Sequence, residues 1–377
     1  MDMERLNMSQ PLDLTQLRDD LQKAGNPWQM DPGNSMVQLT EDERQVRLGF
    51  IPGPDDISFE QAVKQDVSAS HEAPIKSTFE SLGLPAKYCL DNVGGKNFTT
   101  PVKDQGGCGS CVAFGTAAVL ETTYKKQHNT PNHNVNLSEA HLYYCHAKEE
   151  GRTCENGWWP QNALAKAKDK GVTLDDYFPY TAGNQGCSLQ GGWQDNLAKP
   201  SGHTKVNGRQ KMKEWLINKG SLTGCFIVYQ DFFSYKTGVY RHVSGNEAGG
   251  HCVEIIGYDD TLNCWICKNS WGTGWGDKGY FKIGYGQCQI ETWSGPYGAN
   301  SVTIRQWEMS TKVSGLWANS SDRNAWVYLH GAGWKKVTTE SEIAQKTQLT
   351  QLISAKAAAR AVRVLHENDK IEQIYVL

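Results

Sequence analysis

The spacing of hydrophobic positions divides the central part of the chain into a helix-rich half and a strand-rich half. Apolar residues recur at helical spacing over 112–126, and 137–147 and 160–170 are two further helix candidates. Ser138 or Asn136 is placed to cap the second of these three helices. After Gly220, short apolar runs alternate with glycine-rich turns. Strands are therefore expected at 225–229, 252–258, 264–268 and 279–283.

The N-terminal segment has a weaker pattern. Leucines at helical spacing predict a helix over 12–24. Thr40 is placed to cap a second, short helix, with Glu43 completing a capping box. The run Ile51-Pro-Gly-Pro-Asp-Asp then breaks any helix. We interpret residues 1–80 as a separate segment that wraps a larger domain formed by 81–299.

The C-terminal segment, 300–377, is expected to be a small α+β domain of its own. Its pattern predicts a helix over 341–361, and it predicts strands at 316–317, 325–329, 334–337 and 371–376. Trp317, Trp326 and Trp334 suggest a sugar-stacking surface, but we expect them to form the core of this domain, because buried aromatics are the commoner case.

Composition narrows the range of partners. Hydrophobic residues make up 38% and charged residues 21%, as in an ordinary globular protein. The net charge is -3 and no basic stripe is present, so we expect no nucleic-acid partner. No run of about 18 apolar residues occurs, so we expect no membrane insertion. Met1–Gln22 is polar and acidic and does not resemble a secretory signal.

The densest chemical signal is Gln105-Gly-Gly-Cys-Gly-Ser-Cys-Val-Ala-Phe114. Cys111 immediately precedes the predicted helix, whose free N–H groups and positive dipole end lower the pKa of a thiol. Gln105 is near enough to donate its amide to an oxyanion, together with the N–H of Cys111. A cysteine in this position is by itself more often a small buried residue than a nucleophile.

Two further motifs make the chemical reading specific. His251 follows two glycines at the predicted start of a strand, and Asn269 precedes a Gly-Trp turn, where its amide can hold the imidazole. Trp271 can shield that bond from water and so strengthen it. His251 and Asn269 lie about 140 and 160 residues after Cys111, which is the order and spacing of the papain and cathepsin enzymes.

Residues 84–297 resemble the papain-like cysteine peptidases almost throughout. The matching segments are Pro101-Val-Lys-Asp-Gln-Gly, Cys108-Gly-Ser-Cys-x-Ala-Phe, Leu137-Ser-Glu, Tyr177-x-Pro-Tyr180, Asp231-Phe-Phe-x-Tyr-x-x-Gly-Val-Tyr240, Gly250-His and Lys268-Asn-Ser-Trp-Gly-x-x-Trp-Gly276. The resemblance implies an α+β fold with a helical lobe, a β-barrel-like lobe and a cleft between them. It also implies the disulfides Cys108–Cys154 and Cys145–Cys187.

The resemblance assigns roles to the residues of the cleft. It implies Cys111 as the nucleophile, His251 as the general acid and base, Asn269 as the residue that orients the histidine, and Gln105 in the oxyanion hole. The implied reaction is hydrolysis of a protein or peptide substrate by a monomeric enzyme, without metal or cofactor.

The chain departs from the family at several positions. Val112 replaces the usual tryptophan after the nucleophile. The Cys-x-Gly-Gly loop that holds an extended substrate appears as Cys154-Glu-Asn-Gly157, and Gly157 is our choice for the binding residue. Cys288 lacks its usual disulfide partner.

The specificity pocket and the remaining thiols follow from the same alignment. We expect the pocket to be lined near Trp158, Cys252 and Trp293, and to be narrowed by the last of these. Four cysteines are expected to be reduced and buried: Cys225, Cys252, Cys264 and Cys267.

The N-terminal segment occupies the place of a family propeptide. Leu39-Thr-Glu-Asp-Glu-Arg-x-x-x-Leu-Gly49 resembles the leader of bacterial members, so we expect a zymogen with its own N-terminal segment in the cleft. The two implied disulfides favour a secreted or other oxidising compartment.

Three other functional classes have some support in the sequence. Cys108-x-x-Cys111 and Cys264-x-x-Cys267 have the spacing of a thiol–disulfide oxidoreductase. The second pair lies in a predicted strand, where residues three apart point to opposite faces, and the first lacks the βαβ setting. A catalytically inactive binding protein is disfavoured because every catalytic residue is present. Acyl transfer to an amine instead of water is equally compatible with these residues.

Overall fold

The computed structural model describes residues 13–70 and 83–377. Among them the α-helices are α1 (Leu14–Lys23), α2 (Glu41–Gln45), α3 (Phe59–Ser70), α4 (Cys111–Gln127), α5 (Pro160–Lys170), α6 (Arg209–Asn218) and α7 (Glu342–Ala357). The strands are β1 (Trp28–Met30), β2 (Lys87–Cys89), β3 (Val172–Thr173), β4 (Leu197–Pro200), β5 (His203–Lys205), β6 (Leu222–Tyr229), β7 (Tyr235–Tyr240), β8 (Glu247–Asp259), β9 (Cys264–Lys268), β10 (Tyr280–Gly284), β11 (Tyr297–Ala299), β12 (Val302–Ala318), β13 (Ala325–Leu329), β14 (Gly333–Lys336), β15 (Ala361–Glu367) and β16 (Lys370–Val376). No helix within these ranges is long and apolar enough to cross a membrane.

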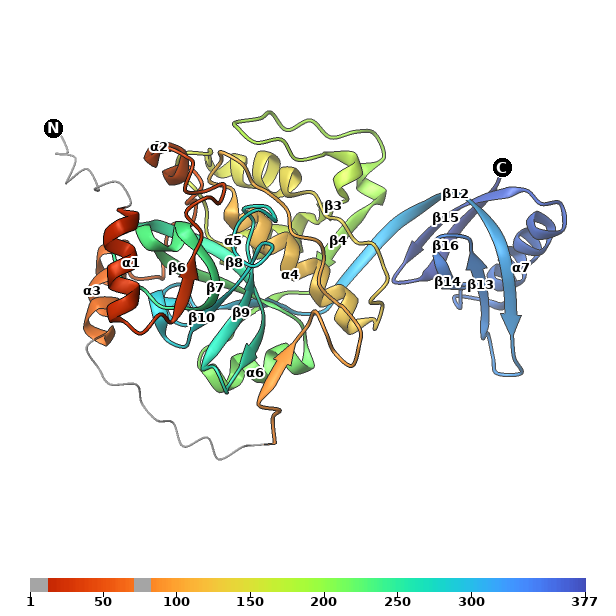
Figure 1. Cartoon of the computed structure of the whole chain (residues 1–377). Helices are drawn as coiled ribbons and strands as arrows, with labels where there is room; N and C mark the ends of the chain where they lie inside the picture. The colour runs from red at the N-terminus through yellow and green to blue at the C-terminus, as the bar shows by residue number, and fades with distance from the viewer. Residues whose placement is uncertain (1–12, 71–82) are drawn as a thin grey trace.

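The main body consists of a helical part packed against a sheet (Figure 1). The sheet has the order β1-β7-β10-β9-β8-β2, with β6 paired to β8. The predicted helix at 112–126 is α4, which is buried on almost every side. A helix without a polar face belongs in the interior, and α4 accordingly lies between the helical part and the sheet.

The other predicted elements of the main body are also present. The helix expected at 137–147 is a π-helix over His141–Ala147, and Ser138 Oγ accepts the His141 N–H at 2.9 Å. The prediction at 160–170 is confirmed by α5, and the four predicted strands are confirmed by β6, β8, β9 and β10.

The N-terminal segment is held on the main body along its length. Part of the predicted helix is α1; Leu12 lies outside the described residues. The capping box at Thr40 and Glu43 is formed. Strand β1 pairs with β7, with Trp28 opposite Gly238. The predicted boundary at 80 falls in 71–82, outside the described residues.

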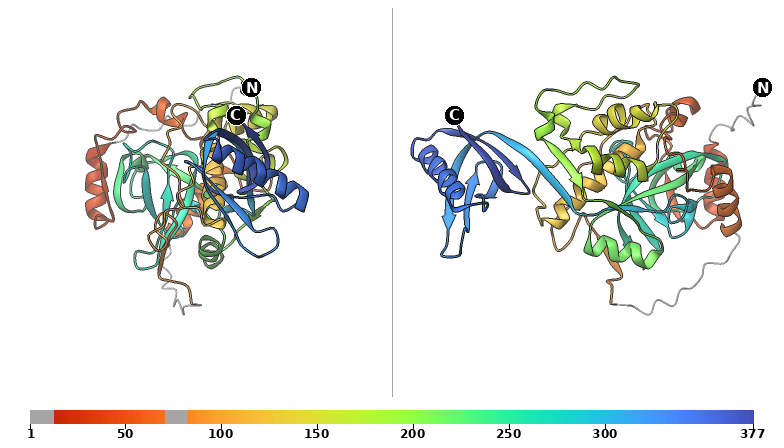
Figure 2. Two further views of the ribbon diagram at one scale, coloured as in Figure 1. Left: turned by 90° about the vertical axis from the view of Figure 1, so that its right-hand side faces the viewer. Right: turned by 180° about the vertical axis from the view of Figure 1, so that it is seen from behind.

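The C-terminal unit is a small barrel capped by α7. Its strands pair in the order β12-β13-β14-β16-β15, and β15 returns to β12. The start of β12 pairs with β4 of the main body, so this strand joins the two parts (Figure 2). The predicted helix at 341–361 ends at Ala357, and β15 begins where we expected helix.

The expectation that three tryptophans form the core of this unit is wrong. Trp317 is 47% exposed and Trp334 is 48% exposed. The core consists of the aliphatic residues that alternate with the aromatics, such as Val327 and Leu329, together with Leu352 of α7. A small barrel has little interior volume, and the branched aliphatic side chains fill it while the indoles remain outside.

Candidate active site

Cys111 is the first residue of α4, and its side chain is buried. Ser110, at the N-cap position, makes no side-chain cap hydrogen bond. The Ala113 N–H donates to the Ser110 carbonyl at 2.8 Å, so the N–H groups of Cys111 and Val112 are left for a negative charge that develops near the start of the helix. The neighbouring Cys108 is bonded to Cys154, which fixes the loop that leads into the helix.

His251 and Asn269 are brought together by adjacent parts of the sheet. His251 lies on β8, and Asn269 directly follows β9. His251 Nε2 lies 2.8 Å from Asn269 Oδ1, which also accepts the Ser270 N–H. Because Asn269 Oδ1 is a hydrogen-bond acceptor, the ring nitrogen that faces it must be a donor. His251 Nε2 therefore carries the proton. Nδ1 is buried without a hydrogen-bond partner and is left as a base.

Trp271 covers the His251–Asn269 pair. Its ring centroid lies 4.6 Å from that of His251, and its side chain is only 1% exposed. Excluding water in this way strengthens the histidine–asparagine bond, as we expected from the sequence.

Gln105 is held in place from two sides. Ser270 Oγ donates to its Oε1 at 2.7 Å. Its Nε2 donates to the Cys108 carbonyl at 2.8 Å and to the Arg47 carbonyl at 3.0 Å. The amide donor is thus aimed at a carbonyl oxygen of the N-terminal segment. Sequence reasoning missed the role of Ser270, although this residue stands in the same motif as Asn269.

Residues 47–51, which we call the leader strand, run along the site. Phe50 N donates to the Gly250 carbonyl at 3.0 Å. Ile51 N donates to the Trp158 carbonyl at 3.0 Å, and Trp158 N donates to the Gly49 carbonyl at 2.9 Å. The bridge between Phe50 and Trp158 is parallel.

The leader strand leaves the turn after α2, and the residue that pairs with it at Phe50 is Trp158. Gly157, which we predicted to bind an extended substrate, packs its backbone against Gly49. The indole of Trp158 is fully buried and donates to Glu150, so its backbone and not its side chain faces the leader strand.

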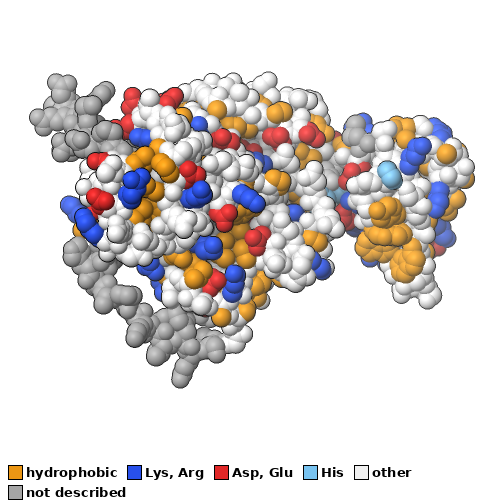
Figure 3. Space-filling view, in the orientation of Figure 1, with side chains coloured by type: hydrophobic (Ala, Val, Ile, Leu, Met, Phe, Trp, Pro, Cys, Tyr) orange, Lys and Arg blue, Asp and Glu red, His pale blue; other side chains and the backbone are white. Residues whose placement is uncertain are grey.

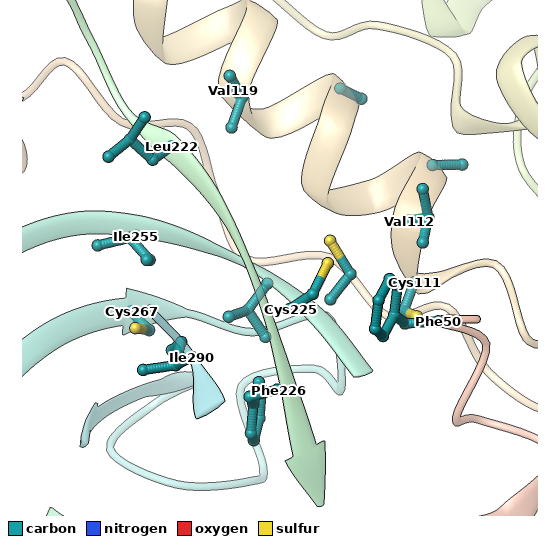
Figure 4. Packing of buried hydrophobic residues seen from close by; sticks show 14 of the residues in the cluster. Phe50, Cys111, Val112, Val119, Leu222, Cys225, Phe226, Ile255, Cys267 and Ile290 are labelled. Atoms are coloured by element: carbon teal, nitrogen blue, oxygen red, sulfur yellow. The ribbon is translucent and has the colours of Figure 1, made fainter. Parts of the chain in front are cut away.

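The leader strand places an aromatic ring beside Trp293. The ring of Phe50 meets that of Trp293 edge-on at 4.6 Å, and Phe50 lies next to Cys111 at the start of α4 (Figure 4). We had expected Trp293 to narrow this pocket, yet the space beside it holds a benzyl group. Trp293 Nε1 donates to the Ile57 carbonyl, which fixes the indole as one wall.

Burial suppresses both charges of the site. It raises the pKa of the Cys111 thiol well above its usual value, and this exceeds the opposing effect of backbone N–H groups, including that of Gly49. Burial also lowers the pKa of His251 to about 4, against a smaller opposing effect of Asn269. With the leader strand in place, the thiol and the imidazole are therefore both neutral near pH 7.

The two disulfides and four of the free cysteines match the sequence predictions. The two disulfides are Cys108–Cys154 and Cys145–Cys187. The four cysteines expected to be reduced and buried are so. Of these, Cys252 follows His251 on β8 and lies opposite Cys225 on the neighbouring strand β6; both thiols are free. Because Cys108 is bonded to Cys154, the oxidoreductase reading of Cys108 and Cys111 as a redox pair is wrong.

Comparisons with known proteins show which family the chain resembles. A family profile described as "Papain family cysteine protease" matches residues 88–295. A "Cathepsin B-like CP2" of Giardia intestinalis is 34% identical over 205 residues, which cover 50% of this chain and 66% of that protein. A "Gut-specific cysteine proteinase" of Caenorhabditis elegans is 33% identical over 219 residues, covering 51% of this chain and 66% of the relative.

The match therefore spans just under two thirds of these curated relatives. Among solved structures, "proCathepsin B S9 from Trypanosoma congolense" has a TM-score of 0.60 at 24% identity, covering 77% of this chain and 99% of that one. This likeness shows the same α+β fold. Since the family profile matches more than half of the chain, the protein belongs to the papain family of cysteine proteases.

Proposed function

We propose that the chain is a cysteine endopeptidase that hydrolyses peptide bonds at Cys111, His251, Asn269 and Gln105, and that it is made as an autoinhibited zymogen. The observation that carries the proposal is the His251–Asn269 contact of 2.8 Å, which leaves the buried Nδ1 of His251 without a partner, while the backbone N–H of the next residue, Cys252, bonds the Cys111 sulfur at the start of α4. The N–H groups there and the Gln105 amide supply donors for an oxyanion.

The chemistry divides into acylation and deacylation. His251 takes the proton of Cys111, and the thiolate attacks the substrate carbonyl carbon. Gln105 and the Cys111 N–H stabilise the oxyanion, and His251 protonates the leaving amine. Water activated by His251 then hydrolyses the thioester. Asn269 keeps the imidazole in the tautomer that this proton transfer requires.

The leader strand blocks the site. The Arg47 carbonyl takes up the Gln105 amide, which an oxyanion would otherwise use. The Gly49 N–H of the leader strand hydrogen-bonds the Cys111 sulfur. The leader strand therefore occupies both the amide donor and the nucleophile, so it inhibits the enzyme.

The pocket beside Trp293 is the part of the cleft that we assign to substrate selection. It holds Phe50, so we propose that it accepts an aromatic or large apolar side chain of the substrate. The two disulfides support action in an oxidising compartment.

The test uses protein without residues 1–80 and a fluorogenic peptide library that varies the residue bound in this pocket. Hydrolysis is expected with aromatic residues preferred, and Cys111→Ala should abolish it. Cys89→Ala, which changes a free cysteine outside the site, is the matched control and should keep full activity. Hydrolysis that survives Cys111→Ala would sink the proposal.

A further inference from the structure

The C-terminal unit carries a strip of exposed aromatic side chains on one side of its barrel. Trp317 is 47% exposed, Tyr328 37% and Trp334 48%. Monomeric proteins keep large aromatics mostly buried, so a contiguous exposed group indicates a binding surface. Figure 3 shows hydrophobic side chains gathered on the face of this unit that is turned to the viewer.

Strand register shows that these aromatics share one face. Trp317 on β12 lies opposite Trp326 on β13, and Tyr328 lies opposite Trp334 on β14. Directly opposed residues of antiparallel strands point to the same side, as do residues two apart on one strand. We call the surface formed by Trp317, Trp326, Tyr328 and Trp334 the aromatic face.

The floor of the aromatic face is shaped by Gly315. This residue lies opposite Tyr328, and a Cβ there would come within 3.2 Å of Tyr328 Cβ and 3.4 Å of Trp334 Cη2. The Trp334 ring therefore lies over the backbone of β12 and does not project away from it. Tyr328 and Trp334 hold each other edge-on, with centroids 5.3 Å apart.

The strand topology of the barrel matches a known fold that binds ligands on the corresponding face. The strand order β12-β13-β14-β16-β15, closed by β15 on β12, has its helix between β14 and β15 and a parallel contact between β14 and β16. This is the arrangement of the OB-fold, a five-stranded Greek-key barrel. Its second and third strands, here β13 and β14, form the surface on which such barrels bind oligosaccharides or single-stranded nucleic acids.

Charge distinguishes these two ligand classes. A single-stranded nucleic acid needs a row of cations that tracks its phosphates. Lys336 on β14 lies opposite Trp326 and is the charged residue beside the aromatics on the paired positions of β12, β13 and β14. Its Nζ lies 5.7 Å from the centre of the Trp326 ring. Its neighbour Lys335 is buried and paired with Asp369.

The rim of the aromatic face is neutral and rich in hydrogen-bonding groups. The β12–β13 loop holds Asn319 and Asn324 joined side chain to side chain, and Trp326 Nε1 donates to Asn324 Oδ1 at 3.0 Å. Arg323 in this loop is paired with Asp322. Amides beside exposed indoles suit hydroxyl groups on an apolar ring face better than they suit a polyanion.

We propose that the aromatic face binds a neutral oligosaccharide, with sugar rings stacked on Trp317 and Trp334 and hydroxyls bonded at the β12–β13 loop. The C-terminal unit then holds the main body close to a polysaccharide or to glycan-bearing proteins. This binding site is separate from the cleft and is independent of the proposed peptidase activity.

The test titrates the full chain with cellohexaose, xylohexaose, mannohexaose and chitohexaose by calorimetry and tryptophan fluorescence. At least one of these is expected to bind, and Trp317→Ala and Trp334→Ala should each weaken that binding at least about tenfold, or 1.4 kcal/mol. Tyr375→Ala, at an aromatic that is 54% exposed on β16, is the matched control and should leave the affinity unchanged. Circular dichroism checks that the variants fold.

Four outcomes would overturn the proposal. The first is that none of the four saccharides binds, and the second is that binding is insensitive to both tryptophan substitutions. The third is tighter, salt-dependent binding of a dT15 oligonucleotide that is lost in Trp334→Ala, which would assign the face to nucleic acid. The fourth is a dimer in sedimentation that Trp334→Ala dissociates, which would make the face a contact between copies of this chain.

Discussion

At the scale of single residues, the leader strand passes Cys111 only because three glycines meet there. A Cβ on Gly49 would lie 1.9 Å from the Gly109 carbonyl oxygen, and a Cβ on Gly157 would lie 2.2 Å from the Gly49 carbonyl oxygen. Both neighbours are backbone atoms and cannot move aside cheaply. No larger residue fits at these positions without displacing the leader strand.

Gly49→Ala is therefore expected to activate the full-length protein. The clash would destabilise the covered state, in which the leader strand lies over the site, by about 1–3 kcal/mol. This corresponds to a roughly 5- to 150-fold increase in the population of molecules whose leader strand is released. Peptide hydrolysis by full-length protein measures this effect. The control is Gly33→Ala, where a Cβ meets nothing closer than 3.6 Å; equal activity in the two variants would contradict the argument.

In the enzyme without residues 1–80, Asn269→Ala should lower kcat by about 10- to 100-fold. This decrease is smaller than the one expected from loss of the general base. Asn269 orients His251 but does not react, so hydrolysis weakens and does not vanish. Steady-state kinetics with one peptide measure the change. A loss as complete as that of Cys111→Ala would show that Asn269 does more than hold the imidazole.

At the scale of elements, the leader strand acts as part of an N-terminal segment that is tied to the body elsewhere. Helix α1 is anchored where Ser244 Oγ donates to Asp20, and β1 pairs with β7. The bridge between Phe50 and Trp158 is thus one contact of a longer attachment. Inhibition should depend on the whole segment.

Removal of the segment should raise activity strongly. A form beginning near Leu84 loses the Arg47 carbonyl from Gln105 and the Phe50 ring from its pocket. The comparison is the kcat/KM of this form with that of the full-length chain. If the two forms are equally active, residues 1–80 are not inhibitory.

Acid should weaken the hold of the leader strand. Burial lowers the pKa of His251 to about 4 in the covered state, from an ordinary value near 6.5. When the leader strand is released, His251 binds a proton more readily. The covered state, in which the leader strand lies over the site, therefore loses stability as pH falls from about 6.5 to about 4, and its stability changes no further below pH 4.

Hydrogen exchange of residues 47–51 in Cys111→Ala protein should report this change as faster exchange at pH 4.5 than at pH 7, after correction for intrinsic rates. In Cys111→Ala/His251→Gln protein the difference should shrink. An unchanged difference would assign the pH effect to other groups.

At the scale of the whole molecule, the helical part is tied together by two covalent links. The disulfides join residues separated by 46 and 42 positions. Closing a loop of this length removes unfolded-state entropy worth about 4 kcal/mol per bond. Neither cysteine of Cys145–Cys187 belongs to the catalytic residues proposed above, so its loss should act on stability more than on chemistry.

Cys145→Ala/Cys187→Ala should therefore lower the free energy of unfolding by about 2–4 kcal/mol and reduce Tm. The same double variant without residues 1–80 should keep its peptidase activity at low temperature. Denaturant unfolding of the full chain measures the loss. Cys89→Ala serves as the control that removes a thiol but no bond. Unchanged stability in the double variant would contradict the entropic account.

The sequence by itself determined most elements of the main body and the residues of its candidate site. Helix α4 and the four strands followed from apolar spacing, because burial on every side leaves a pattern that local reading detects. Cys111, His251 and Asn269 stand in dense motifs in a fixed order, and both disulfides followed from the same resemblance.

Only the tertiary structure decided which surfaces meet. That Trp158 and not Gly157 pairs with the leader strand depends on how a loop and a distant segment approach each other. That Trp317 and Trp334 lie outside the barrel depends on strand register, and a shift of one residue would reverse every side chain. Local patterns encode what a residue prefers, whereas long-range packing decides what it touches.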